Sequence, residues 1–147
     1  VFARRGIHDA IIDATPAGIE FFHGYTYSGH PLAAAAALAT LDVYRDEGLF
    51  ERARDIAPYW EVALHSLRGV RHVIDIRNLG LVGAVELEPR AGKPGARAFD
   101  VFLECFKAGF LVRATGDTIA LSPPLIISRE QVDELVDGIR TAVGGVA

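Results

Sequence analysis

Apolar residues recur every three or four positions along much of the chain, the pattern of helices that bury one face. The first long helix is predicted from Pro31, which suits a first helical turn, to Glu47, with Gly48 ending it. A shorter helical turn is expected before it, at residues 6–13. A second long helix should end at Gly69, and its expected core face consists of Phe50, Ala53, Ala57, Trp60, Leu64 and Leu67.

Two more helices are predicted nearer the C-terminus. One carries an aromatic stripe that we expect to lie in the core, formed by Phe99, Phe102, Leu103, Phe106 and Phe110, and it ends at Gly109. The last helix begins with Ser128 and Gln131, which have the spacing of a capping box. Its expected buried face contains Val132, Leu135, Val136 and Ile139.

Between these helices, short runs rich in valine and isoleucine predict strands. Residues 70–76 and 81–88 should form an antiparallel hairpin joined by "RNLG" at 77–80. Residues 110–113 and 118–122 predict a second pair of strands, joined by "ATGD". This order of elements predicts an α+β domain in which helices pack on a mainly antiparallel sheet.

Composition narrows the classes of protein. The net charge is −4 and the basic residues are scattered, so no nucleic-acid partner is expected. No apolar run is long enough to span a bilayer, and the five histidines lack metal-ligand spacing, so neither a membrane partner nor a metal site is expected. The single cysteine, Cys105, is expected to be a buried, inert thiol, and its isolation favours a cytoplasmic location. Half of the residues are hydrophobic, which suggests that some apolar surface meets a partner or sequence missing from this chain.

A loop rich in hydrogen-bonding groups precedes the first long helix. In "FFHGYTYSGHPLAAAAALATL", residues 21–41, Thr26, Ser28 and Gly29 stand just before Pro31. Helix N-termini present unpaired N–H groups and a partial positive charge, so such a loop is suited to hold a phosphate or carboxylate. The alternative interpretation is that Ser28 or His30 only caps the helix.

This loop resembles a segment of the class III, or omega, aminotransferases, in which a threonine before "SGHP" reaches the phosphate of pyridoxal 5'-phosphate across a dimer interface. Residues 1–11, 77–88 and 112–128 resemble further segments of the same family, in the same order. The resemblance implies a pyridoxal-phosphate enzyme of fold type I, with this chain as its C-terminal portion. Residues 1–30 would end the large cofactor domain, 31–48 would be the connecting helix, and 49–147 the small α+β domain.

The resemblance also implies roles for individual residues. Thr26, with the backbone of Tyr25, would bind the cofactor phosphate of the neighbouring subunit in a homodimer. Arg113 would pair with the carboxylate of the amino acid or keto acid substrate, a task that suits a permanently charged guanidinium able to make two parallel bonds. The alternative for Arg113 is an ordinary surface ion pair with Asp117.

The family's Schiff-base lysine has no counterpart here, because the family places it upstream of Val1. Lys93 and Lys107, the two lysines of the chain, stand elsewhere, and the chain alone is expected to be inactive. In the complete enzyme, the implied reaction moves an amino group from an omega-amino acid or amine to pyruvate or a similar keto acid. The rival interpretation is a non-enzymatic small domain that binds a partner or packs as a subunit.

Overall fold

The computed structural model describes residues 4–14, 26 and 29–146. The chain divides into two compact units, Val1–Leu41 and Asp42–Ala147. The three-part division expected from the sequence, with boundaries after residues 30 and 48, stays a prediction.

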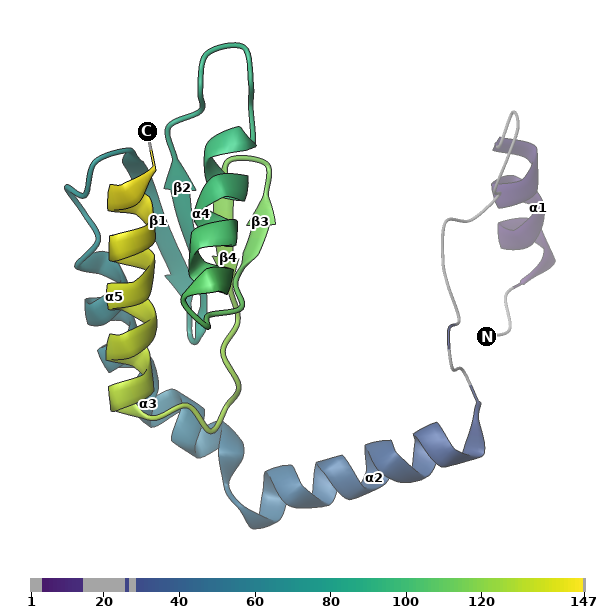
Figure 1. Cartoon of the computed structure of the whole chain (residues 1–147). Coiled ribbons are helices and arrows are strands. Elements are labelled where there is room, and N and C mark those ends of the chain that lie inside the picture. The colour runs from purple at the N-terminus through teal and green to yellow at the C-terminus, as the bar shows by residue number, and fades with distance from the viewer. Residues whose placement is uncertain (1–3, 15–25, 27–28, 147) are drawn as a thin grey trace. The chain divides into compact units, whose positions relative to one another are not determined.

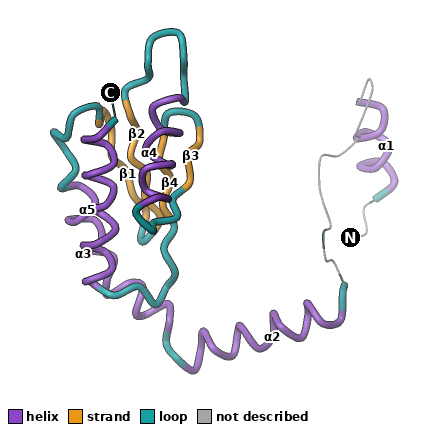
Figure 2. The backbone as a smooth tube through the Cα atoms, in the orientation of Figure 1, coloured by secondary structure: helices purple, strands orange, loops and turns teal. Residues whose placement is uncertain are grey.

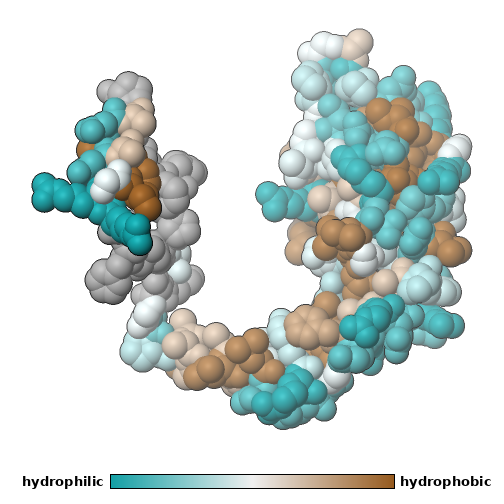
Figure 3. Space-filling view, turned by 180° about the vertical axis from the view of Figure 1, so that it is seen from behind, coloured by the Kyte–Doolittle hydropathy of each residue, from teal (hydrophilic) through white to brown (hydrophobic). Residues whose placement is uncertain are grey.

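Two helices begin in the first unit. Helix α1 spans Arg5–Ala14 and helix α2 spans Pro31–Asp46, close to the bounds expected from the sequence. The alanine-rich sequence of α2 favours a helix, and Gly48, with φ of 59°, follows its end. No residue of either helix is buried, and Figure 3 shows apolar side chains exposed along α2.

The second unit contains a four-stranded sheet in the order β1-β2-β4-β3, with antiparallel pairing throughout (Figures 1 and 2). Its strands are β1 (Val73–Leu79), β2 (Val82–Leu87), β3 (Arg113–Thr115) and β4 (Thr118–Leu121). The mainly antiparallel sheet and both predicted hairpins are therefore confirmed.

The strand boundaries differ from those expected. Leu79 pairs with Val82, so the first turn is only Gly80 and Leu81, and most of "RNLG" belongs to β1. Gly80 adopts φ of 55°, which a glycine supplies without a Cβ clash. The expected strand at 110–113 was wrong apart from its last residue, because β3 begins at Arg113 and only residues 113–115 pair with β4.

Three helices cover one face of this sheet: α3 (Leu49–His65), α4 (Ala96–Lys107) and α5 (Arg129–Gly145). Helix α5 contacts both α3 and α4, and in Figure 1 the strands lie behind α4 and α5. The core between the helices and the sheet includes Trp60, Leu64, Leu67, Val85, Leu87, Val101, Ile119, Val132 and Ile139, all fully buried. Helix α3 approaches β2 at Gly83, where an added Cβ would lie 2.6 Å from Leu64 Cδ2.

Two expected core faces were partly wrong. On α3, Phe50 is 57% exposed, and its neighbour Leu49 is buried instead. On α4, Phe99 and Phe106 are 54% and 63% exposed, whereas Ala98, Val101 and Cys105 face the core. The buried positions follow helical spacing, and two of their three side chains are small, so α4 packs closely while Phe99 and Phe106 stay outside. Both of these rings contact the half-buried Phe102, which packs against the core, with centroids 5.9 Å apart for Phe99 and Phe102 and 6.3 Å for Phe102 and Phe106.

The start of α5 confirms the predicted capping box. Ser128 Oγ accepts a hydrogen bond from the backbone N–H of Gln131 at 3.2 Å, and Gln131 Oε1 accepts one from the N–H of Ser128 at 3.0 Å. Two N–H groups at the helix start are thereby satisfied. Within the described ranges, no helix combines the length and apolarity that crossing a bilayer requires.

Candidate functional site

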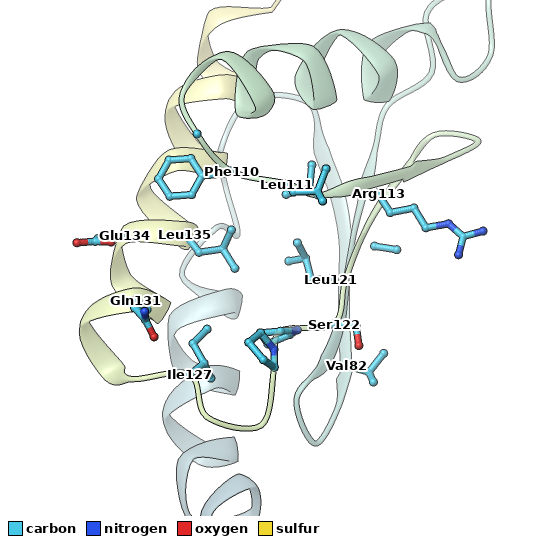
Figure 4. A pocket seen from close by; sticks show the side chains of 15 residues that line it. Val82, Phe110, Leu111, Arg113, Leu121, Ser122, Ile127, Gln131, Glu134 and Leu135 are labelled. Carbon is cyan, nitrogen blue, oxygen red and sulfur yellow. The ribbon is translucent and has the colours of Figure 1, made fainter. Parts of the chain in front are cut away.

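An open pocket of ≈ 730 Å³ lies in the second unit, where the segment between α4 and β3 meets the end of β4 and the start of α5 (Figure 4). Its lining is mostly apolar, with Arg113, Ser122, Gln131 and Glu134 as the polar side chains. The other lining residues are Val82, Gly109, Phe110, Leu111, Val112, Ala120, Leu121, Pro123, Pro124, Ile127 and Leu135.

Local backbone features form the walls of this pocket. Gly109, with φ of 91°, lets the chain turn away from α4, and the N–H of Phe110 donates to Cys105 O at 2.8 Å. The Phe110 ring lies against Gly138 of α5, where an added Cβ would come within 2.6 Å of the ring. On the opposite wall, Pro123 and Pro124 end the strand ladder because proline has no N–H to donate.

Arg113 lies at the edge of the pocket, as the first residue of the edge strand β3. Its side chain is exposed, and Figure 4 shows the guanidinium pointing away from Leu135 and Ile127. Among the described residues, no carboxylate lies within ion-pair distance of it. The guanidinium is therefore available to an external carboxylate.

The register of the sheet places a second arginine on the same outer face. Arg113 is paired with Ala120, Ala120 with Ala84, and Ala84 with Arg77, so these four side chains form one cross-strand row. Arg77 Nη1 donates to Glu86 Oε2 at 2.7 Å and to Asp75 Oδ2 at 2.6 Å, and these bonds raise the pKa of the Arg77 guanidinium. The two arginines therefore differ in availability, because the Arg77 guanidinium is already paired with two carboxylates of the chain.

The alternative role for Arg113, an ion pair with Asp117, is not formed. Asp117 Oδ1 instead accepts a hydrogen bond from the backbone N–H of Gly95 at 2.7 Å. This contact ties the β3–β4 turn to the start of α4.

Of the predicted phosphate-binding residues, Tyr25 and the neighbouring Ser28 lie outside the described residues. Thr26 lies in a turn and is exposed, so its hydroxyl is a chemically suitable donor to a phosphate oxygen. His30 caps α2. Its Nδ1 accepts a hydrogen bond from the N–H of Ala33 at 3.4 Å, and its carbonyl oxygen accepts one from the N–H of Ala34 at 2.9 Å. Because Thr26 and Arg113 belong to different units, a pocket shared by the two stays a prediction.

Other candidate groups are engaged elsewhere. Lys107 Nζ donates to Glu104 Oε1 at 2.6 Å on the exposed side of α4, and neither lysine lines the pocket beside Arg113. Cys105 is buried as predicted, and desolvation raises the pKa of its thiol, which disfavours the nucleophilic thiolate. In the described part of the chain, no group of three or more histidine, cysteine, aspartate or glutamate side chains could hold a metal ion.

Comparison with known proteins adds to this geometry. Residues 2–143 match the family described as aminotransferase class-III. The chain is 56% identical over 146 residues to an omega-aminotransferase of Caulobacter vibrioides, covering 99% of this chain and 33% of that protein. It is 42% identical over 149 residues to a beta-alanine–pyruvate aminotransferase of Pseudomonas aeruginosa, covering 100% of this chain and 33% of that protein.

Solved structures agree with these sequence relatives. A thermostable omega transaminase from Pseudomonas jessenii superposes with a TM-score of 0.74 at 31% identity, covering 84% of this chain and 30% of that one. A transaminase solved with L-alanine superposes with a TM-score of 0.72 at 35% identity, covering 81% and 30%.

The chain therefore belongs to the class III aminotransferases, which are pyridoxal-phosphate-dependent enzymes, and the predicted family and α+β fold are confirmed. It spans about a third of the length of the curated relatives that it matches.

Proposed function

We propose that this chain supplies the carboxylate-binding part of an aminotransferase that moves an amino group from an omega-amino acid or amine to pyruvate or a similar keto acid. The observation that carries the proposal is the exposed guanidinium of Arg113, unpaired among the described residues, beside a mostly apolar pocket. A keto acid has a carboxylate that the guanidinium can bind by two parallel hydrogen bonds. The names of the two sequence relatives described above support the substrate class.

The residues of this chain would act by binding and orienting. Arg113 would hold the acceptor by two parallel charge-assisted hydrogen bonds, which fix the direction of the carboxylate as well as its position. Thr26, with the backbone of Tyr25, would donate to the phosphate of the cofactor. Pyridoxal phosphate, when bound, supplies the electron sink that the transfer of an amino group requires.

The proposed enzyme is a cytoplasmic homodimer whose site is shared between subunits. Exposed apolar side chains on α2, including Leu32, Leu38 and Leu41, support an apolar partner surface (Figure 3). The single cysteine, buried and without a disulfide partner, supports a reducing compartment.

A hybrid enzyme tests this proposal. In the hybrid, this chain replaces the matching 146 residues of the Caulobacter vibrioides omega-aminotransferase. We expect the purified hybrid, supplied with pyridoxal phosphate, to form alanine from pyruvate and an omega-amino acid. The 147-residue chain alone is the control, and it should give neither turnover nor a stoichiometric lysine adduct after borohydride reduction. A folded hybrid that binds the cofactor but transfers no amino group to any keto acid would refute the proposal.

A further inference from the structure

We infer that Asp117 is a positioning residue for Arg113: it fixes the β3–β4 turn to the start of α4 and thereby holds Arg113 in place with its guanidinium unpaired. This inference rests on the proposed function, because Arg113 is taken as the group that binds the acceptor carboxylate. Asp117 itself would not touch the substrate.

Two hydrogen bonds of Asp117 hold the turn at a junction of three elements. Its side-chain Oδ1 accepts from the N–H of Gly95, the N-cap of α4, at 2.7 Å, and its carbonyl accepts from the N–H of Leu87, at the end of β2, at 2.9 Å. The side-chain bond is the one that a substitution can remove. Without it, the turn keeps its backbone hydrogen bond to β2 and loses its side-chain hydrogen bond to α4.

Gly95 lets the start of α4 approach the backbone of the turn at this junction. Gly95 has φ of 78°, and a Cβ built on it would lie 3.4 Å from the carbonyl oxygen of Gly116. A side chain at position 95 would be strained by this positive φ, and its Cβ would be in contact with the turn. The close approach and the Asp117 hydrogen bond therefore hold the same turn in one place.

Electrostatics favours this position of the carboxylate. Asp117 is the single acidic residue in residues 113–121, so it is the hairpin's own candidate to neutralise Arg113. Gly95 provides no side-chain cap, and the free N–H groups and partial positive charge of the α4 N-terminus attract an anion. The carboxylate is thus bound at the helix and does not occupy the guanidinium.

The tie matters to Arg113 because β3 is a short edge strand that packs against α4, the helix to which Asp117 fixes the turn. The strand is three residues long and lies at the edge of the sheet, paired only with β4. Arg113 stands at one end of this strand, and the turn at Gly116 and Asp117 closes the other. A turn that moves relative to α4 would carry β3 with it and spread the positions that the guanidinium samples.

The first part of the test uses the whole 147-residue chain and needs no activity. Asp117→Ala is expected to speed amide exchange at Gly95 about 10-fold or more, because a charge-assisted hydrogen bond is lost. Asp117→Asn keeps an acceptor oxygen, so the rate of amide exchange at Gly95 should stay within about threefold of the rate in the unmodified chain. Asp55→Ala, which removes an exposed carboxylate on α3, is the matched control and should leave Gly95 unchanged.

The second part measures the same variants in the hybrid enzyme. Asp117→Ala should raise KM for pyruvate about 10-fold with kcat within about twofold, and should leave the kinetics of an acceptor that lacks a carboxylate unchanged. Asp117→Asn should have the KM for pyruvate of the unsubstituted hybrid. This result would show that the hydrogen bond to Gly95 matters, and not the negative charge of Asp117.

Each other outcome overturns the inference. Unchanged exchange at Gly95 would show that the contact does not order the turn, and faster exchange with an unchanged KM would show that the turn does not position Arg113. If Asp117→Ala lowered kcat/KM equally for pyruvate and for the acceptor that lacks a carboxylate, Asp117 would have only a general structural role. If the unsubstituted hybrid transfers no amino group, the proposed function fails together with the inference, whereas failure of the Asp117 variants alone leaves the proposed function intact.

Discussion

Replacing Arg113 with glutamine in the hybrid enzyme is expected to lower kcat/KM for pyruvate about 10- to 100-fold, mainly by raising KM. Hydrogen bonds to charged groups contribute about 1.5–3 kcal/mol, and glutamine offers neither the charge nor the two-pronged donor of the guanidinium. Among the described residues the guanidinium has no internal ion pair to lose, so the variant should fold normally. Steady-state kinetics with varied pyruvate measures the effect.

Matched variants and substrates sharpen this result. Arg68→Gln removes an exposed arginine that has no ion pair among the described residues, and it should leave kcat/KM unchanged. Arg113→Lys retains the charge without the planar guanidinium, and its kcat/KM for pyruvate should lie between those of Arg113→Gln and the unsubstituted hybrid. For an acceptor without a carboxylate, Arg113→Gln should change kcat/KM little. Equal losses for both acceptors, or no loss for pyruvate, would contradict the assignment of Arg113.

Truncation of Leu64 is expected to lower the free energy of unfolding of the second unit by about 2–5 kcal/mol. Leu64 is fully buried on α3 and reaches β2 at Gly83, so Leu64→Ala removes buried apolar surface and leaves a cavity. Urea unfolding of the 147-residue chain measures the change, followed by the fluorescence of Trp60. Trp60 is the only tryptophan and lies in the same core.

The control for Leu64 lies on the same helix. Val62 is 73% exposed, and Val62→Ala should change the free energy of unfolding by no more than about 0.5 kcal/mol. Similar losses from the two truncations would mean that α3 does not pack on the sheet through Leu64.

The order of elements in the second unit could be predicted from the sequence, whereas the orientation of two helix faces could not. Trp60 and Leu64 recur at helical spacing, and both are buried as predicted. Phe99 and Phe106 show the same spacing, but α4 buries the neighbouring row with Ala98 and Cys105. Periodicity defines a stripe on a helix, and where two adjacent rows are both apolar, only the packing partner decides which one faces the core.

The candidate site divides in the same way. Arg113 was assigned by resemblance, since one arginine in a short strand carries no chemistry of its own in the sequence. The pocket beside it combines residues from β2, the α4–β3 segment, the end of β4 and the start of α5, and only the folded chain brings these together. The hydrogen bond between Asp117 and Gly95 likewise could not be predicted, because 22 positions separate the two residues and neither belongs to a recognisable motif.

A crystal structure of the hybrid enzyme with pyridoxal phosphate and pyruvate would show which group binds the carboxylate of the acceptor. We expect the pyruvate carboxylate to lie within hydrogen-bond distance of the Arg113 guanidinium, in a cleft where the Thr26 hydroxyl contacts the cofactor phosphate of the other subunit. A structure in which another cation binds the carboxylate, or in which Thr26 and Arg113 face separate clefts, would contradict it.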